Sequence, residues 1–288
     1  MEKRNKIFRR PGFAAAKVIM VVLMSIYAAS LLIPLAWTFL TSLKSQVEFS
    51  TYNVNGLPTR WLFGNYRDAF TVLNIDGSNY FIMLFNSIWY AAGGAFIGVA
   101  VSSMVAYVVA KYKFPGAKFI HSLAIVMMII PIVGSLPSQF RVIKGLGILD
   151  TPFFLVTAAG GFGFNFLILY AYFKSLPWSF AEAAFIDGAG HARVYLTVMM
   201  PQAVPLLSAI GIMALITGWN DYTNPLLFLK SYPTLASGLY MFQVITTREL
   251  NMPVLYAGLL LSAVPILILF IFFSNKIMTI SIGGGLKG

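Results

Sequence analysis

The sequence contains no cysteine and only two histidines, and only 10% of its 288 residues are charged. The missing thiols exclude disulfides and thiolate metal sites, and two histidines are too few for most histidine-based metal centres. A soluble domain carries about a quarter charged residues, so this chain cannot cover a water-facing surface of ordinary size. With 59% hydrophobic residues, the composition indicates an all-α membrane protein.

Sequence patterns of common catalytic sites are also missing. There is no GxxxxGK motif followed by Ser or Thr, so the chain does not bind ATP in the manner of P-loop proteins. Neither a GxSxG nucleophile motif nor an HExxH zinc motif occurs. We therefore expect a chain that is not an enzyme and binds no cofactor of its own.

The net charge of +11 comes from basic residues at the ends of apolar segments. This distribution is typical of membrane topology and of contact with lipid, and it argues against nucleic-acid binding. With the amino terminus inside, 13 of the 20 Lys and Arg residues fall on inside segments and 7 on outside segments. The bias predicts six spans with both termini in the cytoplasm, the first span being an uncleaved helix.

Apolar runs and polar breaks divide the chain into five segments. They are a basic cytoplasmic tail (1–16), a first membrane helix (17–40), an extracytoplasmic loop (41–80), a core of five further spans (81–276) and a cytoplasmic glycine-rich tail (277–288). The core spans are expected at 81–110, 119–143, 152–173, 203–228 and 252–276. Within the loop, the aromatic residues of 58–70 predict an interfacial or docked amphipathic segment.

Small and helix-breaking residues mark the spans. Gly94 and Gly98 form a GxxxG pair, which we interpret as close packing within one subunit. The third and fourth spans contain residues that could act as hinges or as static kinks, and we favour kinks. These residues are Pro131, Gly134, Pro137, Gly160 and Gly161.

A polar stretch at 179–205 interrupts the apolar pattern. Ser179 followed by Glu182 predicts a capping box at a helix start. The turn 188–190 is expected to stop that helix, because glycine reaches the left-handed conformation of helix ends. A second short helix is expected at 191–199, ending before Pro201. Together they predict a polar-faced helix-turn-helix at the membrane edge, which we interpret as the contact for a soluble partner.

This stretch resembles a known motif. The order Glu182-Ala183-Ala184, Asp187-Gly188-Ala189, Pro201 and Pro205 is similar to the EAA loop of importer-type ABC transporter permeases. Five further stretches resemble the carbohydrate branch, in particular the second permease subunit of maltose-type importers. They are 58–70, 86–94, 106–116, 217–225 and the glycine-rich terminus. The resemblance covers about residues 58–288.

The resemblance implies a six-helix type I ABC importer permease with a cytoplasmic EAA coupling helix, in the inner or plasma membrane of a prokaryote. It implies four partner chains: a homologous second permease, two ATPase subunits that hold ATP and Mg, and an extracytoplasmic sugar-binding protein. The chain would form half of an alternating-access pathway, for a di- or oligosaccharide. The residues implied in ATPase coupling are Glu182, Ala183, Ala184, Asp187, Gly188, Ala189, Arg193 and Pro201.

The sequence allows two alternative roles for each of two acidic side chains. Glu182 either caps its own helix or pairs with a basic residue of the ATPase, and one side chain could do both. Asp221 belongs to the cluster Trp219-Asn220-Asp221-Tyr222, a candidate substrate path in which aromatic rings stack on sugars and polar groups bond hydroxyls. The alternative, which we favour slightly, is that Asp221 and Asn220 only satisfy nearby helix ends.

Two other transport functions remain open. One is an ABC importer permease for a non-sugar solute. The other is an ion-coupled secondary transporter, which needs buried carboxylates, and only Asp221 is a candidate. A membrane-embedded enzyme would need a paired acid and base or a metal set, which the sequence lacks.

Overall fold

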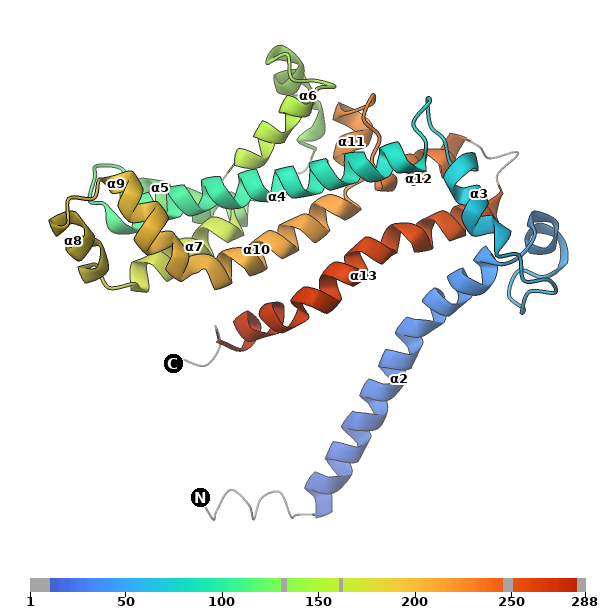
Figure 1. Ribbon diagram of the computed structural model, residues 1–288. Coiled ribbons are helices and arrows are strands. Elements are labelled where there is room, and N and C mark those ends of the chain that lie inside the picture. Colours follow the sequence, from blue (N-terminus) through green and yellow to red (C-terminus); the bar gives the residue numbers. More distant parts are fainter. Residues whose placement is uncertain (1–10, 131–133, 161–162, 246–250, 284–288) are drawn as a thin grey trace. The chain divides into compact units, whose positions relative to one another are not determined.

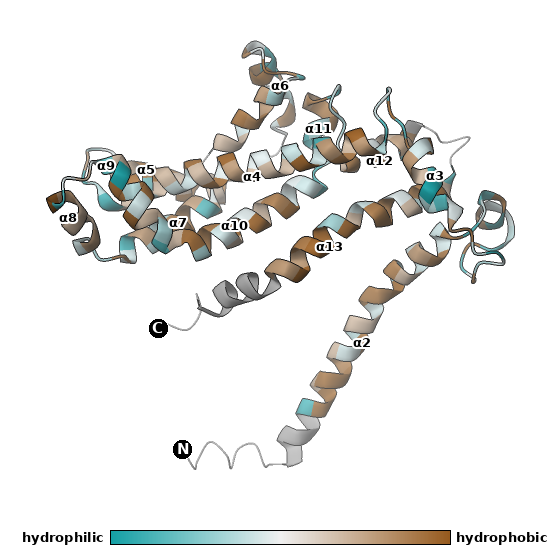
Figure 2. Cartoon of the chain, viewed as in Figure 1, coloured by the Kyte–Doolittle hydropathy of each residue, from teal (hydrophilic) through white to brown (hydrophobic). Residues whose placement is uncertain are grey.

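The structure is a computed structural model that describes residues 11–130, 134–160, 163–245 and 251–283. These residues form helices and turns, with one isolated bridge between Ile75 and Ser78. They group into two compact units, 11–72 with 251–261 and 73–245 with 262–283. Figure 1 labels the helices, and Figure 2 shows that the long ones are mostly apolar while polar residues gather in the connections. The expectation of an all-helical protein is therefore confirmed.

The first unit begins with helix α2 (Pro11–Ser42), which contains the predicted first span. It continues through a π-helical turn, η1 (Glu48–Tyr52), to helix α3 (Gly64–Val72), and it includes the first turns of α13 (Met252–Gly283). Helix α3 confirms a docked segment in the loop. It buries Asn65, whose Nδ2 donates to the Ser42 and Lys44 carbonyls at 2.8 Å each.

The loop after α2 is organised by two buried charged side chains. Lys44 Nζ donates to the carbonyls of Asn53 (2.6 Å) and Val54 (3.0 Å), and Glu48 Oε1 accepts from Asn53 Nδ2 (2.7 Å) and the Thr59 amide (2.8 Å). Burial lowers the pKa of Lys44, and the nearby Glu48 opposes this. Burial alone would raise the pKa of Glu48, but its hydrogen bonds lower the pKa below the ordinary value. The loop is therefore a folded part of the unit.

The second unit is built around helices α4 (Tyr80–Lys111), α7 (Phe164–Ser175) and α10 (Met200–Asn220). Asn79 is the N-cap of helix α4, and its side chain accepts a hydrogen bond from the Ile82 amide. The helix matches the predicted second span. Figure 1 shows α4 and α10 running alongside each other. They approach closely at Gly218, where an added Cβ would lie 3.2 Å from the Ala91 Cα. Glycine therefore permits the close approach, because any larger residue would press against the backbone of α4.

The third span is interrupted, as its proline and glycine residues predicted, and the fourth is interrupted as well. The third is divided into α5 (Ala117–Ile129) and α6 (Leu136–Gly145), and the fourth into a 3-10 helix, η2 (Pro152–Ala159), and α7, bent by 52°. Gly134, which lies between α5 and α6, has φ +74°. Of the proposed kink residues, Pro131 and Gly161 lie outside the described residues. The described helices include four that are long and apolar enough to span a membrane, or five if the bent pair counts as one.

The expected fifth span, 203–228, is also wrong as a single helix. Helix α10 ends at Asn220, and α11 (Thr223–Phe228) and α12 (Leu235–Ile245) follow. Asp221, the C-cap residue of α10, bridges the break, because its Oδ1 accepts the Asn224 amide in the first turn of α11 at 3.1 Å. By contrast, the sixth expected span lies within α13.

The glycines of α4 face η2 within the same unit. An added Cβ at Gly98 would lie 3.2 Å from the Ala158 carbonyl oxygen, whereas one at Gly94 would make an ordinary 3.8 Å contact with Leu155. The interpretation of the GxxxG pair as packing within one subunit is confirmed.

These two glycines should respond differently to substitution. Gly98→Leu should destabilise the protein by about 1–3 kcal/mol, because the added side chain pushes against backbone of η2. Gly94→Ala is the matched control and should stabilise α4 by about 0.5–1 kcal/mol, since alanine favours helix. Thermal unfolding in detergent measures both, and equal effects of the two changes would contradict this packing.

Candidate functional site

The polar stretch folds as two short helices, α8 (Ser179–Ile186) and α9 (His191–Val194). Helix α8 ends in a Schellman motif, in which the Gly188 amide donates to the Phe185 carbonyl at 3.0 Å and the Ala189 amide to the Ala184 carbonyl at 3.0 Å. Gly188 has φ +81°, as such a helix end requires. The predicted glycine stop is confirmed.

The predicted capping box is wrong. Ser179 is the first helical residue, and the N-cap position is taken by Trp178, with no side-chain cap. The amides of Ala181 and Glu182 instead donate to the Trp178 carbonyl. Glu182 is exposed, and among the described residues its side chain makes no capping bond to α8.

The two faces of α8 differ. Ala181 is fully buried against the core, with Ala184 and Phe185 half-buried beside it. The opposite face exposes Phe180 (47%) and Ile186 (86%). Most of the residues implied in ATPase coupling are also exposed: Glu182, Ala183, Asp187, Gly188, Arg193 and Pro201. Ala189 is half-buried. In the part of the chain that the structure describes, no ion pair involves their side chains.

An aromatic cluster holds this element to the end of α4. Tyr112 Oη lies 2.9 Å from His191 Nδ1, and the His191 ring packs edge-on against Tyr112 and Phe185. Trp178 packs against both Tyr112 and Phe185. Lys111 Nζ donates to the Leu176 carbonyl at 2.5 Å. Sequence reasoning missed Tyr112 and Trp178, because their partners are distant in sequence.

The second short helix does not end before Pro201. Helix α9 continues through a π-helical segment, η3 (Tyr195–Met199), into α10, giving one apolar helical run over His191–Asn220. The Met200 amide donates to the Tyr195 carbonyl, five residues back. The π register accommodates Pro201 at the start of α10, because the proline has no amide to donate.

The predicted path residues at the end of α10 point to different partners. Trp219 is buried and donates to the Ser262 carbonyl (3.1 Å), and Asn220 donates to the Ile216 carbonyl of its own helix (2.8 Å). Asp221 Oδ2 accepts from Tyr90 Oη and from Asn224 Nδ2, both at 2.7 Å. The exposed Tyr222 stacks on Tyr240, with ring centroids 4.7 Å apart. Their role in a substrate path stays a prediction.

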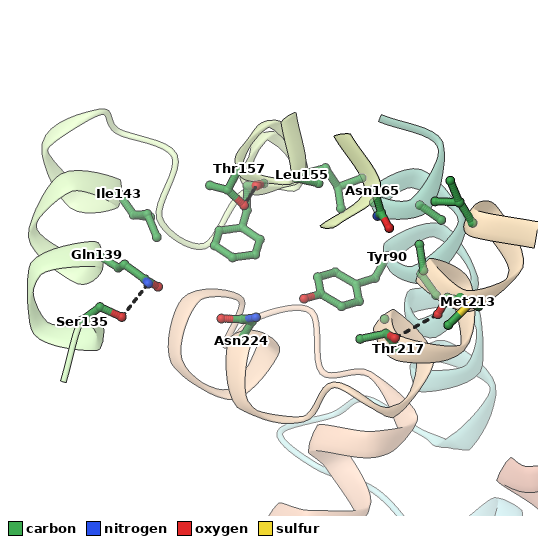
Figure 3. A pocket seen from close by; sticks show the side chains of 18 of the residues that line it. Tyr90, Ser135, Gln139, Ile143, Leu155, Thr157, Asn165, Met213, Thr217 and Asn224 are labelled. Atoms are coloured by element: carbon green, nitrogen blue, oxygen red, sulfur yellow. Dashed lines mark hydrogen bonds between the residues drawn. The ribbon is translucent and has the colours of Figure 1, made fainter. Parts of the chain in front are cut away.

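A cavity of about 880 Å³ lies beside this cluster, between α4, α6, η2, α7, α10 and α11. Figure 3 shows Tyr90, Gln139, Asn165, Thr217 and Asn224 around it. None of the described lining residues is charged, and none belongs to the predicted stretch 219–222. The cavity could accept a small polar molecule, since its size lies in the range of ligand pockets, about 300–1,000 Å³.

Long apolar helices, a partly exposed polar element and a cavity with a mostly apolar wall are typical of a multi-pass helical membrane protein. Residues 98–281 match the family described as "Binding-protein-dependent transport system inner membrane component". The match covers more than half of the chain, and the protein belongs to this family.

Individual relatives resemble most of the chain. The diacetylchitobiose uptake system permease protein NgcG of Streptomyces coelicolor is 29% identical over 92% of this chain and 86% of its own. The maltodextrin transport system permease protein MdxG of Bacillus subtilis is 26% identical over 79% and 81%. A solved bacterial ABC transporter involved in the import of the acidic polysaccharide alginate matches with a TM-score of 0.78, covering 93% of this chain and 98% of its own at 24% identity. This likeness shows the same fold.

Removing Asp221 should loosen the wall of the cavity. Asp221→Ala deletes the acceptor for Tyr90 and Asn224, so we expect a loss of about 1–3 kcal/mol in thermal unfolding. Asp68→Ala, on the exposed face of α3, is the control and should change stability by less than about 0.5 kcal/mol. Equal unfolding temperatures for the two variants would show that the hydrogen bonds of Asp221 do not stabilise the protein.

Proposed function

We propose that this chain is the permease subunit of an ATP-driven sugar importer and forms half of its translocation pathway. The observation that carries the proposal is membership of the binding-protein-dependent transport family, with relatives named for diacetylchitobiose and maltodextrin transport. The partners are a second homologous permease, two ATPase subunits and an extracytoplasmic sugar-binding protein. ATP and Mg are held by the ATPase subunits, and this chain contributes no catalytic group.

The membrane arrangement in this proposal has six spans, with both termini in the cytoplasm and the segment boundaries given by the sequence. The broken third and fourth spans cross as helix pairs, α5 with α6 and η2 with α7. Non-helical backbone at membrane depth is tolerated where it lines a cavity or is buried in protein. The cavity supports this reading, because described residues on either side of the breaks, such as Ser135, Ala158 and Asn165, line it.

Coupling runs through α8 in this proposal. The helix is anchored through Ala181 and presents Phe180, Ala183 and Ile186, an apolar face that fits a groove in a soluble subunit. Glu182 lies beside that face and pairs with a basic residue of the ATPase. The aromatic cluster at His191 then carries the movement of α8 to the end of α4, because packed rings move together.

Uptake assays test the sugar assignment directly. Inner-membrane vesicles that contain the assembled transporter and its binding protein should accumulate an uncharged di- or oligosaccharide. This uptake should occur only when ATP is supplied on the side of the membrane where the ATPase subunits lie. Accumulation of a non-sugar solute under the same conditions would show an importer of another class. Uptake driven by an ion gradient without ATP would instead identify a secondary transporter.

Coupling depends on the left-handed turn after α8. Gly188→Val should reduce ATPase co-purification and uptake by about 5- to 30-fold, because a strain of roughly 1–2 kcal/mol opposes the docked geometry. Gly188→Asn is the matched control and should keep most activity, since asparagine tolerates φ > 0. Co-purification with the ATPase measures assembly, and wild-type behaviour of Gly188→Val would refute the docking role.

A further inference from the structure

We propose that the 880 Å³ cavity binds one ring of an uncharged sugar during transport, so that this chain itself contacts the substrate. The proposal rests on the proposed import of sugars and adds the site and the charge class of the ligand. It does not follow from family membership, because a permease can form half of a pathway without holding the substrate.

The lining of the cavity defines the chemistry of its ligand. Side-chain amides and hydroxyls from α6, η2, α7, α10 and α11 are set into a wall that is mostly apolar, made of aliphatic side chains and the rings of Tyr90 and Phe154. No lining residue among those described carries a charge. A charged solute would lie there without a counter-ion, which costs far more than burial of hydroxyl groups that find partners. The wall therefore fits a neutral polyol with both polar edges and apolar faces.

Asn165 provides the strongest single indication of a ligand. It is the second residue of α7, it is half-buried, and its side chain lines the cavity. Within the described ranges, its side-chain amide makes no hydrogen bond to the protein. The residue also borders a smaller cavity of about 200 Å³, which Ser102 and Gly98 help to line. An amide that holds no structural bond and faces two cavities is available to both donate to and accept from a hydroxyl.

Other polar side chains of the lining are held in place by one hydrogen bond and keep further donors or acceptors for a ligand. Gln139 Nε2 donates to Ser135 Oγ at 2.9 Å, which leaves its carbonyl oxygen and a second N–H. Asn224 Nδ2 donates to Asp221, which leaves the Asn224 carbonyl oxygen. Thr217 donates its hydroxyl proton to the Met213 carbonyl at 2.9 Å and can still accept. The lining thus offers several acceptors at fixed positions, as a molecule with several hydroxyl groups requires.

The aromatic walls are also fixed. The Tyr90 hydroxyl donates to Asp221, and the Phe154 ring stacks on Phe228 with centroids 5.3 Å apart. Figure 3 shows Tyr90 between Asn224 and Asn165, so an apolar ring face and two amides border the same space. A pyranose ring has the matching pattern of C–H faces and hydroxyl edges. Asp221 is a positioning residue here, because it orients Tyr90 and Asn224 without lining the cavity.

Sugar binding to the assembled transporter tests this site. The complex of both permeases with the ATPase is purified without the binding protein, and its Kd for diacetylchitobiose and for maltotriose is measured by calorimetry. Asn165→Ala and Gln139→Ala should each raise the Kd of the bound sugar by about 3- to 10-fold, as expected for one lost hydrogen bond. Both variants should keep the wild-type unfolding temperature, because neither amide holds two elements together.

Ser208→Ala is the matched control. Ser208 lies on α10, donates to the Val204 carbonyl and is outside the cavity lining, so its loss should leave the Kd unchanged. Wild-type Kd values in both Asn165→Ala and Gln139→Ala would overturn the site while leaving sugar import intact. A wild-type complex that imports the sugar but shows no saturable binding would overturn it as well. If the complete transporter imports only non-sugar solutes, the proposed function fails and the site with it.

Discussion

A helix break in an apolar surrounding leaves backbone groups without partners, and this constraint governs the second unit. Polar side chains from other elements supply the missing partners. Asp221 accepts the Asn224 amide, Asp150 accepts the Ser231 amide at 2.8 Å, and Asn86 donates to the Pro233 carbonyl at 3.0 Å. These bonds hold the connections around α11 in position, and Asn224, which makes one of them, lines the cavity.

The long helices could be predicted from the sequence because each depends only on a local run of apolar residues. Helices α2, α4 and α13 lie where the hydropathy pattern placed them. The breaks could be located only roughly, because proline and glycine mark a weak point without showing what satisfies it. The end of α10 illustrates the difficulty, since Asp221 acts on Asn224 nearby but also on Tyr90, which is 131 residues away.

The same difference between local and long-range signals is seen in the α8–α9 element. Its glycine turn was predictable because a left-handed helix end has a local signature, and Gly188 has it. Its start was not, since Trp178 takes the N-cap position and packs against Tyr112 from the end of α4. The cavity was missed for a related reason: Asn165 and Gln139 are unremarkable in sequence and become notable only when α6 and α7 are brought together.

One continuous helical run links α9 to the cavity. From His191 to Asn220 it has 30 residues, about 45 Å of helix, with His191 in the aromatic cluster and Thr217 at the cavity wall. The π-helical turn at 195–199 inserts one extra residue into this rod. Each residue turns an α-helix by about 100°, so the insertion sets the angular phase between the two ends. An uninterrupted α-helix would place His191 at a different angle about the helix axis relative to Thr217.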